Sequence, residues 1–567
     1  MTTQDRPINA AEALLMRLKQ NGVDFLFANG GTDFPPVIEG IAHGMARGAD
    51  LPEVVIAPHE TAAVGMAHGY YLMTGKAQAL MVHVNVGLAN CVMGMINAAS
   101  ENIPMLVMAG RTPITEHDRF GSRMITIQYA QEMRDQPAMV RELVKWDYEM
   151  RYGEQAELLA DRALAIARTD PKGPVYLGLP REPLSEPWPE ERAAVNPRQA
   201  APAAPQPDQA AIDQAAEWLA AAENPLIVCQ RGDPQGRLGA AMVEFAARYS
   251  IPVAEFLTMR NVLPSDHPMQ AGYDSGPLVA EADAILVVDS QVPWIARNHQ
   301  PKATAKVIHA GPDPQFQRMP VRSFQSDLAI VGDPAAVVTA LDAAMAARGA
   351  GDKARGERLA RQHEARRSEL REQALAGNGS PMTPAYVSHC ITEAMDDEAV
   401  LINELGAPAM FATIRRPNQF LSAPYSGGLG WGLTAALGAK LADRERLVIA
   451  CIGDGSYMFA NPVACHQIAE AHDLPVLIVL MNNGIWNAVK RATRLLYPEG
   501  NAMRMNTTPV TSLEPAPDYG AIIAASRGWS EDVAHGDDLP GALQRAIKVV
   551  REERRQALLN VRVSPAP

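Results

Sequence analysis

Two short motifs in the last third of the chain carry residue types that bind a metal ion and a diphosphate. Residues 453–456 read Gly-Asp-Gly-Ser after the apolar run LVIACI, and residues 482–483 read Asn-Asn after the apolar run VLIVLM. Each motif therefore stands at the carboxyl end of a predicted parallel strand, where open α/β sheets bind ligands. A carboxylate and an amide oxygen suit a hard cation such as Mg²⁺. The glycines let the backbone approach a diphosphate.

Two residues in the first third of the chain are candidates for proton transfer. Glu60 follows the stretch EVVIAP and opens the helical pattern TAAVGMAHGYYLMTG. Taken alone, it fits an ordinary first-turn acid that stabilises a helix N-terminus. His83 lies in LMVHVNVGLAN at the end of another apolar strand, where an imidazole can titrate near neutrality. The alternative for His83 is a buried histidine bonded to the backbone.

The elements that must position these residues alternate between short apolar runs and helical patterns, which predicts parallel α/β sheets. Residues 185–207, rich in Pro, Ala and charge, and residues 347–383, which begin with an Arg-, Gly- and Glu-rich run, are interpreted as linkers, the second with a solvated helix. The blocks that remain, residues 1–184, 208–346 and 384–567, have ordinary domain sizes. The expected fold class is α/β, with three doubly wound parallel-sheet domains. Strands are predicted at residues 25–28, 54–57, 79–84, 105–109, 175–179, 225–229, 253–256, 284–289, 306–310, 399–403, 447–452, 476–481 and 557–563.

Composition excludes several classes of partner. The chain has 567 residues, of which 47% are hydrophobic, and a net charge of −13. An acidic surface repels phosphate backbones, so nucleic acids and anionic membranes are poor partners. No apolar run approaches the roughly 20 residues of a membrane span, and no signal peptide is visible. Five widely spaced cysteines suit reduced thiols, so we expect a cytoplasmic enzyme.

The Gly-Asp-Gly motif, its spacer and the Asn-Asn pair resemble the metal–diphosphate fingerprint of thiamine-diphosphate-dependent enzymes. The resemblance covers nearly the whole chain, in the order pyrimidine-binding domain, central domain and diphosphate-binding domain. It implies that the side chains of Asp454 and Asn483 and the carbonyl of Ile485 bind Mg²⁺, while Asn482 braces the turn. It also implies that Glu60 hydrogen-bonds the aminopyrimidine, which favours the imino form that activates the cofactor.

Further cofactor contacts follow from the same resemblance. Gly427 and Leu429 belong to a Gly-Gly-Leu-Gly turn, where Leu429 would wedge the cofactor into a bent shape and the carbonyl of Gly427 would accept from the 4′-amino group. Residues 403–407 follow a predicted strand and are expected to offer backbone N–H groups to the diphosphate. The implied cofactor-binding set is Glu60, Asn403, Gly406, Ala407, Gly427, Leu429, Gly453, Asp454, Gly455, Ser456, Asn483 and Ile485.

The segment around His83 resembles the benzoylformate decarboxylases, which have a catalytic histidine at this point. The resemblance implies that Thr32 contacts the substrate carboxylate, with neighbouring Asp33 open to interpretation as a turn residue. It also places His299 of the central block in the active site, and a surface loop histidine is the alternative. Gln131-Glu132 instead resembles a glutamine–glutamate pair of acetolactate synthases.

The predicted substrate pocket departs from that of the benzoylformate decarboxylases. Two of their pocket aromatics align with Ala423 and Ala492. Trp431 and Trp486 stand nearby, which predicts a reshaped pocket. The predicted pocket set is Thr32, His83, Trp486 and Val489. The basic residues Lys490, Arg491 and Arg494 either attract a second anionic group or form a solvated helix face.

The sequence therefore predicts a thiamine-diphosphate- and Mg²⁺-dependent, non-oxidative decarboxylase of a small-molecule 2-oxo acid. Glu60, His83, His299 and Thr32 are its predicted catalytic residues. Three alternatives stay open: an acetolactate-synthase-like carboligase, a C–C hydrolase or lyase of a dione or 2-hydroxy ketone, and a catalytically silent cofactor-binding subunit. The resemblance implies a homodimer at minimum and commonly a homotetramer. FAD is not expected, because the first central strand exits into CQRGDPQG rather than a glycine run.

Overall fold

The computed structural model describes residues 6–189, 199–349 and 351–565. Two compact units form within it. The first contains the chain up to Ala203 together with Pro424–Arg444 and Ala460–Leu474. The second contains Ala204–Ala423, Glu445–Phe459 and the chain from Pro475. Two segments of the predicted third block thus pack with the first unit, and the predicted boundaries at residues 184 and 346 stay predictions.

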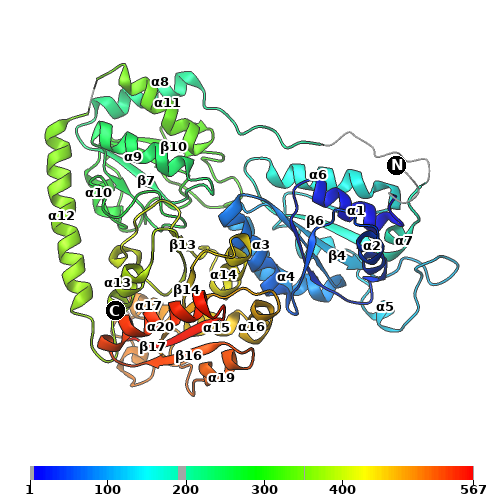
Figure 1. The fold of residues 1–567 in the computed structure, drawn as a ribbon. Coiled ribbons are helices and arrows are strands. Elements are labelled where there is room, and N and C mark those ends of the chain that lie inside the picture. The colour runs from blue at the N-terminus through cyan, green and yellow to red at the C-terminus, as the bar shows by residue number, and fades with distance from the viewer. Residues whose placement is uncertain (1–5, 190–198, 350, 566–567) are drawn as a thin grey trace. The chain divides into compact units, whose positions relative to one another are not determined.

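The first unit is built on a six-stranded parallel sheet of order β2-β1-β3-β4-β6-β5. The strands are β1 Phe25–Asn29, β2 Glu53–Ile56, β3 Gln78–Val82, β4 Met105–Arg111, β5 Asp147–Glu149 and β6 Val175–Pro180. The helices are α1 Ala10–Gln20, α2 Pro35–Ala46, α3 Glu60–Thr74, α4 Val84–Ser100, α5 Ile127–Ala130, α6 Ala156–Arg168, α7 Arg181–Ser185, α14 Trp431–Ala442 and α16 Pro462–Ala471. Helices α1, α2, α6 and α7 share one hydrophobic core with one face of the sheet, and α3 and α4 pack on the strands from the other side (Figure 1).

The second unit holds two parallel sheets. The central sheet has the order β11-β10-β9-β7-β8 and the last sheet the order β13-β12-β14-β15-β17-β16. The strands are β7 Pro225–Cys229, β8 Val253–Ala254, β9 Ala284–Val288, β10 Lys306–Gly311, β11 Leu328–Val331, β12 Val400–Glu404, β13 Phe420–Ser422, β14 Val448–Gly453, β15 Leu477–Asn482, β16 Trp529–Val533 and β17 Ala557–Arg562. The helices are α8 Gln209–Ala221, α9 Arg237–Tyr249, α10 Gly276–Glu281, α11 Pro334–Ala346, α12 Lys353–Leu375, α13 Pro384–Ala394, α15 Asp454–Phe459, α17 Asn487–Leu496, α18 Asn501–Arg504, α19 Tyr519–Ala524 and α20 Leu539–Glu552.

The three sheets confirm the expected α/β fold class, and the two six-stranded sheets share one topology. Numbered along the chain within each sheet, both have the strand order 2-1-3-4-6-5. In each, the direction of winding reverses between the first and third strands of its segment, β1 and β3 or β12 and β14. Ligands of open α/β sheets bind at this reversal point, outside the carboxyl ends of the strands.

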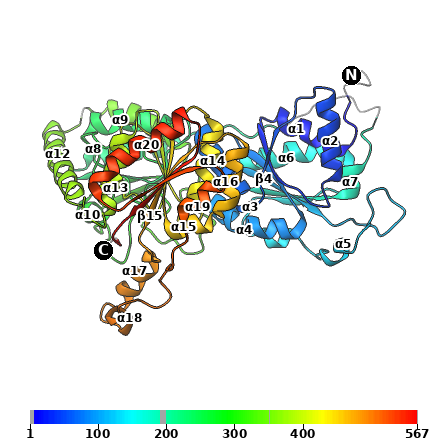
Figure 2. The same cartoon turned by 60° about the horizontal axis from the view of Figure 1, so that its bottom comes forward.

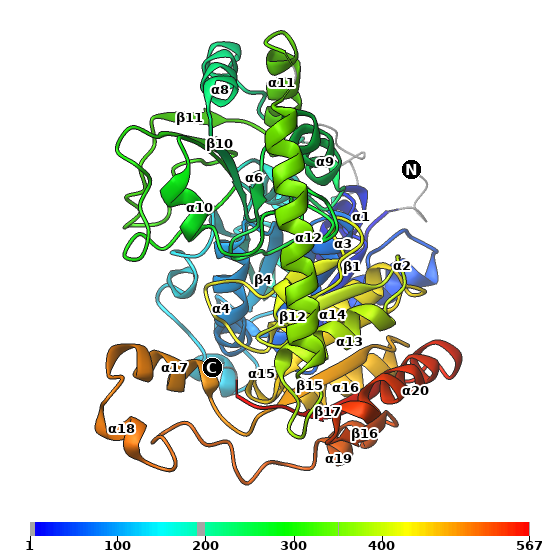
Figure 3. The ribbon, with the colours of Figure 1, turned by 90° about the vertical axis from the view of Figure 1, so that its left-hand side faces the viewer.

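The linker predictions fall partly on described residues. Residues 190–198 and 350 lie outside them. The predicted solvated helix is α12, which runs past the helices of the central sheet and packs against α13 (Figure 3). Most of its side chains are exposed, and Arg355 fixes its first turn by donating to the carbonyls of Tyr249 and Ser250.

Four strands escaped prediction, and all four lie at sheet edges: β5, β11, β13 and β16. An edge strand is covered on fewer sides, and polar residues interrupt the apolar pattern of β5 and β16. Strands β11 and β13 are largely apolar but only four and three residues long. The prediction also ran β3 through His83 and Val84, whereas the strand ends at Val82 and α4 begins at Val84. Helices α17 and α18 stand away from the rest of their unit (Figure 2), and α17 has no buried residue. Within the described residues, no helix has the length and hydropathy to cross a membrane.

Candidate active site

Glu60 is the first residue of α3, and its carboxylate is buried and held by two amides. Its exposed fraction is 5%. Asn29, the last residue of β1, donates from Nδ2 to Oε1 at 2.9 Å, and Asn90 of α4 donates from Nδ2 to Oε2 at 2.9 Å. Sequence reasoning missed both asparagines. The position of Asn29 at the end of a strand beside the reversal point was the available signal.

His83 forms a close pair with Asp33, a residue of the loop between β1 and α2. His83 Nδ1 lies 2.5 Å from Asp33 Oδ1, and the N–H of Val84 donates to Asp33 Oδ2 at 3.3 Å. Asp33 is 3% exposed. The hydrogen bond to Asp33 raises the pKa of His83, burial opposes this shift, and the charge of Glu60 adds to it. Asp33, which the sequence left open as a turn residue, therefore lies in a loop and is also the hydrogen-bond partner of His83.

Two glycines leave the space in which this pair fits. A Cβ on Gly31 would lie 2.1 Å from His83 Nδ1, and a Cβ on Gly110 would lie 1.6 Å from Asp33 Oδ2. Neither glycine has a positive φ, so its backbone conformation does not require glycine. Glycine is needed at both positions because a Cβ would clash with the side chain of His83 or Asp33. A Cβ on the neighbouring Gly30 would meet only Phe34, at an ordinary contact distance of 3.6 Å.

The backbone at the start of α4 is strained. Val84 has a φ of +31°, which is a genuine outlier for a β-branched residue. Such conformations persist only where surrounding contacts enforce them. The carboxylate of Asp33, which accepts from the Val84 N–H as well as from His83, is such a contact. Strand β3 therefore ends in a turn that aims the His83 ring at Asp33.

Gln131 approaches the other nitrogen of the same ring. Its Nε2 lies 3.1 Å from His83 Nε2, while its buried Oε1 has no hydrogen-bond partner among the described residues. The next residue, Glu132, anchors this loop by accepting from Arg111 at 3.0 Å and from Arg123 at 2.6 Å. The two residues of the Gln131-Glu132 pair therefore have different contacts. Gln131 contacts His83, and Glu132 forms the ion pairs that hold the loop.

Thr32 occupies a different environment from its neighbour Asp33. Its side chain is exposed, and its carbonyl accepts from Arg181 Nη1 at 3.2 Å. Arg181 is itself buried and also donates to the carbonyls of Gly121 and Ser122. This arginine therefore ties the Thr32 turn to the loop that carries Gln131.

The Gly-Gly-Leu-Gly turn packs against α4 in the first unit. Gly427 and Gly430 have φ of +74° and +86°, so both positions favour glycine. Asn97 of α4 donates to the carbonyl of Gly428 at 2.8 Å and accepts from its N–H at 3.1 Å. These two hydrogen bonds to the backbone of Gly428 hold the turn that carries Leu429, a half-buried residue.

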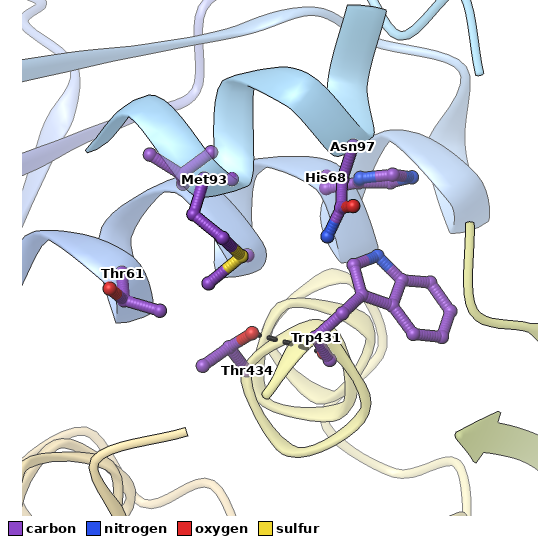
Figure 4. Close-up of a pocket in the computed structure, with 9 residues that line it drawn as sticks. Thr61, His68, Met93, Asn97, Trp431 and Thr434 are labelled. Carbon is purple, nitrogen blue, oxygen red and sulfur yellow. Dashed lines mark hydrogen bonds between the residues drawn. The ribbon is translucent and has the colours of Figure 1, made fainter. Parts of the chain in front are cut away.

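A small cavity, with room for about one water molecule, lies between α3, α4 and α14 (Figure 4). Its walls include Thr61, His68, Asn97 and Thr434. Trp431, which the sequence placed near a substrate pocket, is buried here with its ring 5.5 Å from that of His68. Its Nε1 has no partner among the described residues, which suits a buried water in this cavity. Trp431 thus contributes to helix packing.

Asp454 begins α15 directly after β14, with its carboxylate held by main-chain groups. Oδ2 accepts from the N–H of Gly484 at 2.7 Å, and Oδ1 accepts from the N–H of Gly455 at 2.9 Å. Burial raises the pKa of Asp454, and these N–H bonds oppose that shift. The predicted metal-binding oxygens of Asn483 and Ile485 each accept one backbone N–H, from Ile485 and Asn487 respectively. A carbonyl-type oxygen has two lone pairs, so each keeps one for a cation.

The two glycines beside Asp454 serve different purposes. A Cβ on Gly453 would meet only Ser456 Oγ, at 3.9 Å, which leaves open space beside the buried Ser456. A Cβ on Gly455 would lie 2.2 Å from the Trp486 ring, so this glycine makes room for an indole. Trp486 also packs edge-on against Phe459, at 5.7 Å between ring centroids, and Val489 is about half exposed.

Two further predicted contacts lie elsewhere in the second unit. Asn403 of β12 accepts the N–H of Ala407 at 2.7 Å, so this expected diphosphate donor is engaged by a side chain. Gly406 packs against Cys451, which a Cβ would approach to 2.6 Å. The ring of His299 lies against Gly276 of α10, at 2.3 Å from the position of a Cβ. Glu60, His83 and Thr32 belong to the first unit, whereas His299 belongs to the second.

The fold is α/β, and it places buried polar side chains at the reversal points of two like sheets, the position where open α/β sheets bind ligands. Three family models match the chain, all of the thiamine pyrophosphate enzyme: the N-terminal TPP binding domain at residues 8–139, the central domain at 212–341 and the C-terminal TPP binding domain at 404–561. These matches span more than half of the sequence. The chain belongs to the thiamine pyrophosphate enzyme family.

The relatives that match over most of the chain include enzymes of different activities. The chain is 26% identical to benzoylformate decarboxylase of Pseudomonas aeruginosa, over 94% of this chain and 96% of that protein. It is 24% identical to the acetolactate synthase large subunit of Haemophilus influenzae, over 96% and 93% respectively. A 4-hydroxybenzoylformate decarboxylase of Rhodococcus jostii RHA1 shares the fold with a TM-score of 0.77, at 23% identity over 98% of this chain and 99% of that one.

Proposed function

We propose that this chain is a thiamine-diphosphate- and Mg²⁺-dependent non-oxidative decarboxylase of a 2-oxo acid. The observation that carries the proposal is the His83–Asp33 pair at 2.5 Å, in the same unit as the buried carboxylate of Glu60. An imidazole that can hold a proton near neutrality is what aldehyde release requires, because a proton must replace the lost carboxyl group. The similarity to benzoylformate decarboxylase supports the same reading.

The residues present fit the cofactor and its metal. Asp454, Asn483 and the carbonyl of Ile485 would hold Mg²⁺, which offsets the cost of a buried carboxylate charge. The described residues contain no group of three or more His, Cys, Asp and Glu side chains suited to a metal, so the cation would depend on this mixed oxygen set. The open space at Gly453 would admit the diphosphate, and Asn403, Gly406 and Ser456 would line its approach.

Thiamine diphosphate, when bound, supplies the nucleophilic carbon and accepts the electron pair that carbon dioxide leaves behind. Glu60 would hold or release the proton that the aminopyrimidine exchanges, and Asn29 and Asn90 fix the orientation of its carboxylate. His83 delivers a proton from its ring to the carbon that lost carbon dioxide. The net reaction converts a 2-oxo carboxylate and one proton into an aldehyde and carbon dioxide.

Acetolactate-synthase-like carboligation is the second candidate, and Gln131 favours it. The Gln131-Glu132 pair resembles one found in acetolactate synthases, and relatives of that kind match over most of the chain. In such an enzyme an acceptor carbonyl takes the place of the proton. Gln131 lies on the His83 ring, where its amide would orient that acceptor.

Product analysis separates the two activities. The purified protein, loaded with thiamine diphosphate and Mg²⁺, is given a panel of 2-oxo acids with and without an acceptor aldehyde, and carbon dioxide, aldehyde and ligation product are measured. We expect aldehyde equal to the carbon dioxide released, and loss of that activity in His83→Ala while cofactor still binds. Abundant acetolactate from pyruvate, with little free aldehyde from any acid, contradicts the decarboxylase proposal.

We also infer a homodimer or homotetramer in the cytoplasm. The family resemblance supports the oligomer. In members of the family, the glutamate that corresponds to Glu60 and the diphosphate site meet across a subunit interface. Five free, buried cysteines suit a reducing compartment. Light scattering of the purified chain, with and without cofactor, tests the oligomer directly.

A further inference from the structure

We propose that Asp33 and Gln131 are positioning residues that clamp the two ring nitrogens of His83, so that Nε2 alone exchanges the catalytic proton. This inference rests on the proposed function only in assigning His83 to proton transfer. The clamp itself follows from the contacts of three side chains in the first unit: the loop after β1, the N-terminus of α4 and the residue after α5.

Asp33 decides which nitrogen carries the permanent proton. An ionised carboxylate only accepts hydrogen bonds, so the 2.5 Å contact requires a hydrogen on His83 Nδ1. The same carboxylate accepts from the N–H of the strained Val84, which fixes its orientation through both oxygens. A Cβ on Gly31 would clash with the His83 ring, and a Cβ on Gly110 would clash with the Asp33 carboxylate. With Nδ1 committed, Nε2 is the nitrogen whose protonation changes.

Gln131 suits both protonation states of Nε2. When Nε2 is bare, the amide Nε2 of Gln131 donates to it across 3.1 Å. When Nε2 carries a proton, an acceptor is needed, and the buried Oε1 of Gln131 has no other partner among the described residues. Rotation of the amide exchanges the two atoms. The clamp therefore holds the ring in one place before and after proton transfer, and the amide gives up its hydrogen bond to Nε2 while that nitrogen passes its proton to the substrate carbon.

The charges that face His83 are Asp33, from the loop after β1, and Glu60, from the N-terminus of α3. Arg181, the first residue of α7, donates to the carbonyl of neighbouring Thr32 and is electrostatically coupled to Asp33. Removal of the Asp33 charge therefore lowers the pKa of His83, while a carboxylate at position 131 raises it. A side chain with a purely structural role would produce neither directed shift.

The test uses full-length protein labelled with ¹⁵N in its histidines, with His83→Ala to identify the His83 signals. In the cofactor-free wild type we expect the neutral ring to carry its proton on Nδ1. Asp33→Asn is expected to lower the pKa of His83 and to shift the proton toward Nε2, because an amide can donate to Nδ1. Gln131→Glu is expected to raise the pKa. Asp24→Asn, which alters a carboxylate bound to Tyr70 and Lys76 in the same unit, is the matched control and is expected to change neither quantity.

Kinetics complete the test. Asp33→Asn is expected to lower kcat by roughly 10²-fold, within the range of lost acid–base help, with a smaller change in KM. The alkaline limb of its pH profile is expected to move to lower pH. Unchanged tautomer, pKa and pH profile in Asp33→Asn would overturn the clamp even if His83→Ala is inactive. Full activity of His83→Ala would instead overturn the proposed function, and the tautomer of His83 would still report on the clamp.

Discussion

The two six-stranded sheets share a strand order but use the same edge in opposite ways. At the end of β3, the third strand of the first sheet, His83 is held by the side chains of Asp33 and Gln131. At the end of β14, the third strand of the last sheet, Asp454 is held by the backbone N–H groups of Gly455 and Gly484. Topologically equivalent positions therefore carry a side-chain network in one sheet and a main-chain cradle in the other.

The difference is between a site edge whose side chains set the pKa of a titrating group and one whose backbone fixes the geometry of a ligand. Side chains set the pKa of a titrating group, so the edge of the first sheet is suited to moving protons. Main-chain N–H groups have fixed direction and no titration, so the edge of the last sheet is suited to orienting the Asp454 carboxylate for a metal and to donating to a diphosphate. Substitutions at the first edge are expected to change turnover, and those at the second edge are expected to change cofactor affinity.

The largest effect is expected from Glu60→Gln. Loss of the carboxylate removes acid–base help at the aminopyrimidine, which lowers kcat by roughly 10²–10⁴-fold. One of Asn29 and Asn90 can still donate to the glutamine oxygen, and the other can turn its amide to accept from the glutamine NH2 group. Thiamine diphosphate is therefore expected to bind with nearly unchanged affinity. Steady-state turnover and a fluorescence titration of the cofactor measure the two quantities. Near-normal turnover would remove Glu60 from the mechanism.

A matched pair of glycine substitutions tests whether clearance at the first edge matters. The Cβ of Gly31→Ala would lie 2.1 Å from His83 Nδ1 and must displace the ring, whereas that of Gly30→Ala meets only Phe34 at 3.6 Å. We expect Gly31→Ala to lose roughly 10²-fold in kcat, as for other losses of proton transfer, and Gly30→Ala to stay close to wild type. Equal kinetics for the two variants would show that the ring position at His83 is not critical.

Much of the fold was predictable from the sequence because buried parallel strands are continuous apolar runs. β7 was predicted with its observed ends, and the other interior strands to within a residue or two. The edge strands β5 and β16 were not predicted, since DYE and WSEDV are largely polar and only partly buried. Pattern reasoning depends on burial, and an edge strand has too little of it.

The sequence singled out candidate site residues where a local feature marked them. Asp454 and Asn483 were proposed because each directly follows a predicted strand, and Glu60 because it opens a helical pattern and matches the family resemblance. The Asp33–His83 pair joins residues 50 positions apart, and the Asn90–Glu60 bond joins residues 30 apart. Spacing does not encode such pairs, which depend on the parallel arrangement of β1 and β3 and on the space left by Gly31 and Gly110.

The second edge is tested by substituting the two glycines beside Asp454. Gly453→Ala adds a Cβ in open space, so the cofactor-free protein is expected to fold normally while thiamine diphosphate affinity falls by about 10-fold or more, since the diphosphate has less room. Gly455→Ala meets the Trp486 ring at 2.2 Å, so it is expected to alter tryptophan fluorescence before any cofactor is added. Calorimetric titration and emission spectra distinguish the two. Unchanged affinity in Gly453→Ala would contradict a diphosphate cradle at this position.

The smallest expected effect is the pH dependence of stability from the first edge. The folded-state pKa of His83 is raised by Asp33 above its unfolded value of about 6.5, so this pair stabilises the fold fully below that pH. The contribution is lost as pH rises through the folded-state pKa. Thermal midpoints of cofactor-free wild type and Asp33→Asn, measured at pH 5.5 and pH 8.5, isolate it because the other histidines are common to both proteins. We expect the difference in thermal midpoint between wild type and Asp33→Asn to be smaller at pH 8.5 than at pH 5.5. The change is a few degrees at most, because the His83 ring is partly exposed. A constant difference across this range would mean that the contact between His83 and Asp33 is neutral, and the first edge would then hold its histidine by shape, as the second edge holds its aspartate.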